Sequence, residues 1–267
     1  MIDATRHTAT GRDLAAMTED TPAARFLDAA VGLLQRVRDE EAANLRAAAA
    51  RIAGTVAAGG RLFAFGAGHS SLPAQDVVYR AGGLALMNLL AVPGATGVGT
   101  GSATLGSALE RVDGLAPAVL AAAPVRSGDL LVVVSLSGRN ALPVEMALTA
   151  RSLGVTVIGV TSRAYADATT SRHHTGTHLV DHCDIVLDSK IAVGDAELTA
   201  DGIGVPFGPA STVVTSALMQ ALMASAAVEL AARGVTPPLL CSGNVDGGHE
   251  RNGTLMAEHA DRIFYRH

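Results

Sequence analysis

The sequence predicts a doubly wound α/β fold, a three-layer sandwich in which helices cover both faces of a parallel sheet. Residues 130–134 are five consecutive apolar residues without polar alternation, which is typical of a strand buried on both faces. Strand and helix patterns of this kind alternate five times along the chain. With 267 residues, of which 49% are hydrophobic, the chain is long enough to bury one full core. We therefore expect a single domain over residues 21–267.

The elements follow from composition and from turn residues. Residues 1–20 are polar and lack periodicity, which predicts a disordered lead-in. Residues 23–58 read as an additional N-terminal helical segment, either one helix or two helices broken near Asp39, that ends at Gly59 and Gly60. The strands are expected at 61–65, 84–92, 130–134, 155–161 and 184–188. The later helices are expected from 72 onward, over 103–122, over 141–153, over 211–233 and after 252 through 265.

A polar turn follows the central strand directly. Its small and polar residues are Ser135, Ser137, Gly138 and Asn140. A helical pattern begins at Ala141, and Pro143 is tolerated because it falls in the first turn. Hydroxyl groups, free backbone N–H groups and the positive end of a helix dipole converge there. The turn therefore predicts a cradle for a phosphate or a similarly sized carboxylate.

A second turn of the same kind lies upstream. It follows the strand at 61–65, precedes the helix that begins at Leu72, and contains Gly68, His69, Ser70 and Ser71. Because the carboxyl ends of parallel strands meet at one edge of a sheet, ligands bind there in open α/β folds. Two such turns side by side predict one binding site.

Composition excludes several classes of partner. The formal net charge of −5 and the absence of a basic run argue against nucleic acid. No secretory leader pattern is visible, and the most apolar helix, at 211–233, is interrupted by Ser216, Gln220 and Ser225, so we expect a cytoplasmic protein with no membrane partner. Cys183 and Cys241 lack metal or redox spacing and are expected to be reduced thiols.

Taken together, the motifs resemble a known family. Gly66-x-Gly68-His-Ser70 and Ser135-x-Ser137-Gly138 each follow a strand, and Ser211-Thr212 opens a later helix. This arrangement resembles the sugar isomerase (SIS) domain. Four further stretches resemble uncharacterised SIS-domain proteins related to phosphoheptose isomerase: Tyr79-Arg-Ala-Gly-Gly83, Ser137-Gly-Arg-Asn-Ala-Leu-Pro-Val-Glu145, Ser171-Arg-His-His-Thr-Gly176 and Ser242-Gly-Asn-Val-Asp-Gly247. The resemblance implies a five-stranded parallel sheet of the flavodoxin-like kind. It also implies a homodimer or homotetramer with sites near subunit interfaces.

The resemblance further implies a ligand and its contacts. The ligand would be a small-molecule sugar phosphate, with Ser135, Ser137 and Asn140 on the phosphate and Ser70 and Ser71 on the sugar. The candidate binding set is completed by Gly68, Gly138, Ser211 and Thr212.

The first functional hypothesis is an aldose–ketose isomerase that works through an enediolate. This reaction needs a base, an acid for ring opening and donors to the enediolate oxygen, but no redox cofactor. Glu110 is the candidate base because it follows the Gly-rich loop 93–101 on the carboxyl-edge side of the sheet. The alternative for Glu110 is an ion pair with a nearby arginine. His69 is either an acid at the site or a partner of its own loop.

Two further residues lie near the final helix. His249 and Glu250 are candidates for a role at the active site of a neighbouring subunit. The alternative for Glu250 is that it only caps the helix. Two other functions stay open: a sugar-phosphate lyase or etherase that uses the same enolisation, and a non-catalytic protein that binds a phosphosugar.

A histidine-rich segment raises the question of a metal. It contains His173, His174, His178 and His182. The spacing of His174 and His178 would suit a shared ligand face on a helix, but Gly176 between them makes a helix doubtful. We therefore expect solvated loop histidines and no metal or other cofactor.

Overall fold

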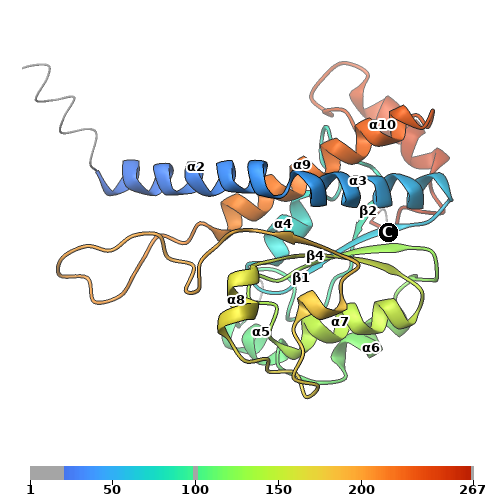
Figure 1. Cartoon of the computed structure of the whole chain (residues 1–267). Coiled ribbons are helices and arrows are strands. Elements are labelled where there is room, and N and C mark those ends of the chain that lie inside the picture. Colours follow the sequence, from blue (N-terminus) through green and yellow to red (C-terminus); the bar gives the residue numbers. More distant parts are fainter. Residues whose placement is uncertain (1–20, 99–101, 266–267) are drawn as a thin grey trace, which may run out of the picture.

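The computed structural model describes residues 21–98 and 102–265, so the lead-in expected at 1–20 lies outside the described residues. Its sheet has five parallel strands in the order β2-β1-β3-β4-β5, with helices on both faces (Figure 1). The doubly wound three-layer sandwich predicted from the sequence is confirmed. The strands are β1 (Leu62–Gly66), β2 (Met87–Leu89), β3 (Leu130–Val134), β4 (Thr156–Thr161) and β5 (Ile185–Asp188).

Two hydrophobic cores lie on opposite faces of the sheet. On β3, Val132 belongs to one core and Val133 to the other, because successive side chains of a strand point to opposite faces. On β1 the same alternation separates Ala64 from Phe63 and Phe65. This is why the central strands are apolar without interruption.

The helices divide between the two faces and the carboxyl edge. Residues of α2 (Pro22–Glu40), α3 (Ala42–Ala57), α4 (Ser71–Asp76), α9 (Ser211–Ala232) and α10 (Gly248–Glu258) join the first core. Residues of α5 (Ala103–Leu109), α6 (Leu115–Ala122), α7 (Ala141–Ser152) and the short 3-10 turn η1 (Leu179–His182) join the second. A further short helix, α8 (Arg163–Ala168), follows β4.

The N-terminal helical segment is two helices rather than one. The break falls at Glu41, whose side chain is only 4% exposed and pairs with the ammonium group of Lys190 at 2.6 Å. The loop after β5 supplies Lys190, so a tertiary ion pair sits at the break. The sequence alone did not decide between one helix and two, because it does not show whether the charged residues near the break face solvent or pair with another segment.

Three expected boundaries differ in the structure. The helix expected over 103–122 is broken between α5 and α6, where Gly114 adopts φ 83° and caps α6. The strand expected over 84–92 pairs with β1 only over Met87–Leu89, because Ala85 instead donates its backbone N–H to Pro238. The final helix ends at Glu258 rather than at Tyr265.

The apolar composition of the long helix α9 follows from its position in the core. It is long and apolar enough to cross a membrane by those two criteria alone. In this fold, however, buried residues such as Leu218, Leu222 and Leu230 lie in the core beside α3 and α4. A helix that is apolar on nearly all sides is also what the centre of a large core requires.

Candidate active site

A cavity of about 360 Å³ opens at the carboxyl edge of the sheet, between the two polar turns. It lies beyond the ends of β1 and β3, where the sequence predicts the site. Among the residues proposed from sequence, those that line it are His69, Ser70, Glu110, Ser135, Ser137, Ser211 and Thr212.

The first turn depends on a glycine at the end of β1. A Cβ atom on Gly66 would lie 2.1 Å from the carbonyl oxygen of Ser70, so no side chain fits there. The hydroxyl group of Ser71 is buried; it donates to the carbonyl of Gly68 and accepts from the N–H of Gly97. Ser71 therefore holds the turn in shape, whereas Ser70 faces the cavity.

The second turn has a similar requirement. Gly138 adopts φ 57°, and a Cβ there would lie 3.0 Å from the hydroxyl oxygen of Thr161. The N–H of Gly138 donates to the hydroxyl oxygen of Ser135 at 3.3 Å. Ser137 lines the cavity, and its hydroxyl makes no hydrogen bond within the part of the chain that the structure describes. Gly138 is buried and does not line the cavity, whereas the hydroxyl groups of Ser135 and Ser137 both line it and donate to no described residue.

Glu110 reaches the cavity from the C-terminal end of α5. Its Oε2 accepts a hydrogen bond of 2.9 Å from the amide of Asn140, and its backbone carbonyl accepts one from Leu142. Its Oε1 lies beside the first turn, 3.2 Å from where a Cβ on Gly68 would stand. The arginine pair considered from the sequence is not formed among the described residues. The carboxylate is therefore held at one oxygen and open at the other.

Asn140 is placed differently from the expectation. It stands at the N-cap position of α7, but its side chain makes no capping hydrogen bond and does not line the cavity, because it is shared between Glu110 and Arg172. Its carbonyl oxygen accepts from the guanidinium of Arg172 at 3.2 Å, while its amide donates to Glu110. In this geometry Asn140 orients a carboxylate rather than binding a phosphate directly.

Tyr165 and Asp195 are among the polar residues that line the cavity and that the sequence did not predict. Asp195 caps α9 by accepting from both the N–H (2.9 Å) and the hydroxyl (2.6 Å) of Ser211. The hydroxyl of Tyr165 accepts from the N–H of Gly194, which ties α8 to the same loop. Asp195 lies in the loop between β5 and α9 and Tyr165 on the short helix α8, and only the packing of these segments brings them to the cavity. The hydroxyl of Ser211 is already engaged as a donor to Asp195, although Ser211 and Thr212 both line the cavity.

The cavity is not positively charged. None of its lining residues within 21–98 and 102–265 is a lysine or an arginine, and two of them, Glu110 and Asp195, are carboxylates. An anionic ligand would therefore be held by hydroxyl groups, backbone N–H groups and the α7 helix dipole.

His249 and Glu250 lie away from this cavity. Both are exposed near the start of α10, and Glu250 lines a different groove together with Thr236 and Arg251. The ring of His249 packs against Gly243. A role for either residue at a neighbouring subunit remains a prediction.

The histidine-rich segment is ordered by hydrogen bonds. His178 caps η1 together with Asp181, and His182 pairs with the hydroxyl of Thr177 at 2.7 Å. Burial lowers the pKa of His182, which favours its neutral form. The sequence predicts solvated histidines, but only His174 is exposed, whereas His178 and His182 are half-buried and His173 is buried. The ring of His174 lies beside that of His173.

Cys183 is an unreactive thiol, as expected from the absence of metal-binding or redox spacing between the cysteines. The Cys183 thiol donates to the carbonyl of Leu179, and burial raises its pKa to about 12. The thiolate, which is the reactive form, is therefore suppressed.

Comparison with known proteins places this geometry in a family. A family model described as the SIS domain matches residues 25–162. A UPF0309 protein of Streptomyces avermitilis is 72% identical over 250 residues, which cover 94% of this chain and 100% of that protein. A UPF0309 protein of Geobacillus thermodenitrificans is 38% identical over 86% of this chain and 92% of its own length.

A solved structure shares the fold. Phosphoheptose isomerase from Neisseria gonorrhoeae superposes with a TM-score of 0.51 at 17% identity, over 83% of this chain and 100% of that one. With the strand order, the two polar turns and the family match in agreement, the chain belongs to the SIS-domain family.

Proposed function

We propose that this protein is an aldose–ketose isomerase that acts on a phosphorylated or similarly anionic sugar. The proposal rests on the groups that surround one cavity. Among the described residues, the carboxylate of Glu110 is hydrogen-bonded at only one of its oxygens, and it lies at the same cavity as His69 and the hydroxyl groups of Ser70 and Ser137. This set contains a base, an acid and anion donors. These are the groups that enolisation of a bound sugar requires.

The proposed reaction moves one proton. The carboxylate of Glu110 removes the proton from the carbon beside the carbonyl and returns it to the former carbonyl carbon. His69, which is exposed at the cavity, donates a proton to the ring oxygen on opening while the anomeric hydroxyl releases one. At the enediolate it donates a proton to the former carbonyl oxygen and takes one from the neighbouring hydroxyl as the new carbonyl forms. Because the carbonyl group and the neighbouring hydroxyl group exchange places on an unchanged carbon skeleton, with no net oxidation, no redox cofactor is consumed.

The first experiment identifies a ligand. A panel of sugar phosphates and their unphosphorylated counterparts is screened for thermal stabilisation, since a ligand at a hundred times its Kd adds about 2.7 kcal/mol. Positive ligands are then incubated in D₂O and followed by proton NMR. An isomerase gives deuterium at the carbon next to the carbonyl and a ketose or aldose product. Loss of a substituent instead identifies a lyase or etherase, and binding without exchange identifies a non-catalytic binder.

Ser137→Ala is expected to weaken binding of the best anionic ligand by about 1.5–3 kcal/mol, because a free donor to a charged group is removed. Titration calorimetry measures the change. Ser152→Ala serves as the control, since the Ser152 hydroxyl is exposed and bonds only to the carbonyl of Thr149. Unchanged affinity in Ser137→Ala means that the anion is held elsewhere.

The protein is expected to form a dimer or larger oligomer. Figure 1 shows α2 projecting beyond the sheet, and its Leu27 and Val31 are exposed, as are Val213 and Val228 on α9. Apolar surface of this extent is usually covered by another subunit. Light scattering at micromolar concentration should give at least twice the 27.0 kDa chain mass. A monomer mass would contradict the expectation and would leave no subunit contact to supply His249 or Glu250.

A further inference from the structure

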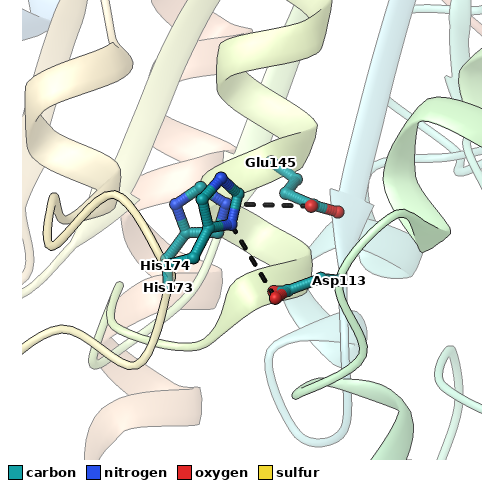
Figure 2. A group of neighbouring side chains, drawn as sticks. All are labelled: Asp113, Glu145, His173 and His174. Carbon is teal, nitrogen blue, oxygen red and sulfur yellow. Dashed lines mark ion pairs between the residues drawn. The ribbon is translucent and has the colours of Figure 1, made fainter.

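Four potential metal ligands gather beside the candidate active site but outside its cavity. They are Asp113, Glu145, His173 and His174, and Figure 2 shows their side chains pointing toward one another. Asp113 lies between α5 and α6, Glu145 lies on α7, and the two histidines lie in the loop before η1. One ligand atom from each residue can be chosen so that all four lie within 4.8 Å of one another.

The distances in this cluster suit a shared ion better than direct hydrogen bonds. His173 Nε2 is 3.7 Å from an oxygen of Glu145, and His174 Nδ1 is 3.8 Å from an oxygen of Asp113. Both exceed hydrogen-bond length. Ligand bonds of about 2.0–2.1 Å around tetrahedral zinc put neighbouring ligand atoms about 3.3 Å apart. The His173–Glu145 and His174–Asp113 pairs would contract by a few tenths of an ångström around one ion, and the widest separation in the set, at most 4.8 Å, would contract by up to about 1.5 Å.

His173 provides an independent indication. Its side chain is 1% exposed, yet its Nε2 is buried without a hydrogen-bond partner and faces the cluster. Buried polar atoms are rarely left unpaired, because desolvation is then uncompensated. The other ring nitrogen, Nδ1, lies 2.7 Å from the hydroxyl of Thr175, which in turn bonds to the hydroxyl of Thr177. With Nδ1–H donating to Thr175, Nε2 carries the lone pair that a metal ion needs.

The carboxylate of Glu145 also lacks a lysine or arginine partner among the described residues. Its carboxylate is 9% exposed, and both oxygens accept from the N–H of Gly114 at 2.9 and 2.8 Å. A buried carboxylate is costly unless a positive charge or several donors compensate it. An ion bound between Glu145 and His173 would supply that charge.

We propose that Asp113, Glu145, His173 and His174 bind one divalent transition-metal ion of the zinc class. Two imidazoles with two carboxylates form a donor set that such ions accept. The two inner ligands are buried, whereas Asp113 and His174 are exposed, so an ion can enter from solvent. The cluster differs from the His174 and His178 pair considered from the sequence, because two of its ligands come from distant segments.

The ion would join the segments that hold Glu110. Asp113 follows Glu110 by three residues, Glu145 lies on the helix that Asn140 caps, and His173 follows Arg172, which bonds to Asn140. Metal binding would thus fix the three pieces of chain around the carboxylate without touching the cavity. The site itself is proposed on its own geometry and does not depend on the sugar chemistry.

The test uses the full chain after chelation and dialysis. Titration calorimetry with ZnCl₂ should show one ion bound per chain, and thermal unfolding should shift to higher temperature with added Zn²⁺. Co²⁺ should give the intense visible absorption of a tetrahedral site. His174→Ala removes an exposed ligand, so the fold is retained, and it should weaken Zn²⁺ binding at least about 10–100-fold.

Matched variants separate this site from chance binding. Asp113→Asn should weaken Zn²⁺ binding as well, whereas His249→Ala, which removes an exposed imidazole elsewhere, should leave stoichiometry and affinity unchanged. Circular dichroism checks that each variant is folded. No binding by the wild-type chain, or equal affinity in His174→Ala and His249→Ala, overturns the proposal. His173 and Glu145 are then a metal-free buried pair.

Discussion

Glu110→Gln is expected to reduce turnover of the identified substrate by about 100-fold or more while binding is retained. Glutamine keeps the length of the side chain and can still accept the hydrogen bond from Asn140, but it cannot take a proton. A positioned general base contributes about 10²–10⁴-fold to rate, so its loss should appear in kcat rather than in KM. Steady-state kinetics and solvent deuterium exchange into the substrate both measure the change.

The Glu110→Gln variant is compared with one control variant and with variants of two alternative candidates for the base. Glu229→Gln alters an exposed carboxylate that pairs with Arg233 on α9, and its turnover should match that of the wild type. If Glu110→Gln retains near-normal turnover, the base is not Glu110. The same kinetics on His69→Gln and Glu250→Gln would then show which of the two residues takes the role.

Lys190→Met is expected to lower the free energy of unfolding by about 3–5 kcal/mol, because it leaves buried carboxylates without their cation. The ammonium group of Lys190 lies 2.6 Å from Glu41 and 3.2 Å from both Glu40 and Asp188. Methionine keeps an unbranched side chain of similar length, so the left-handed backbone at this position, φ 61°, is strained equally in both proteins. Urea denaturation at neutral pH measures the difference.

The matched control for this ion pair is Arg36→Met. Arg36 pairs with the same Glu40 but across an exposed helix surface, where such a pair contributes at most about 0.5 kcal/mol. A similar small loss in both variants would mean that the Lys190 cluster does not hold the helix break at Glu41 in place.

The same cluster should respond to alkaline pH. Burial acts to lower the pKa of Lys190, but hydrogen bonds to Glu41, Glu40 and Asp188 outweigh it, so the pKa is raised above its usual 10.5. The stability that Lys190 contributes is therefore present below pH 10.5 and is lost as the pH rises through the higher pKa of the folded state. Lys190→Met should not show this alkaline loss.

Much of the fold follows from local sequence. The apolar run 130–134 marks a central strand wherever it lies in a chain, because only a strand covered on both faces tolerates such a run. The serine and glycine turns after 66 and 134 then point to one sheet edge by topology alone. Glu110 could be located by the same reasoning, since it follows the neighbouring strand and its loop.

What the sequence left open depends on contacts between distant segments. Asn140 stands in a turn that resembles a phosphate cradle, yet the structure places its amide against Glu110 and its carbonyl against Arg172. Its role depends on which side chains of other segments arrive beside it. The helix expected over 103–122 is likewise interrupted at Gly114, whose N–H donates to the distant Glu145.

The sequence by itself determined the sheet, the two turns and most of the polar residues that line the cavity, because these depend on periodicity and on residues that are near neighbours in the chain. Only the tertiary structure brought Asp195 to the start of α9 and gathered His173 and His174 with Asp113 and Glu145. Loops without periodicity carry Asp195 and the two histidines. Their partners are set by how those loops pack, which no local pattern encodes.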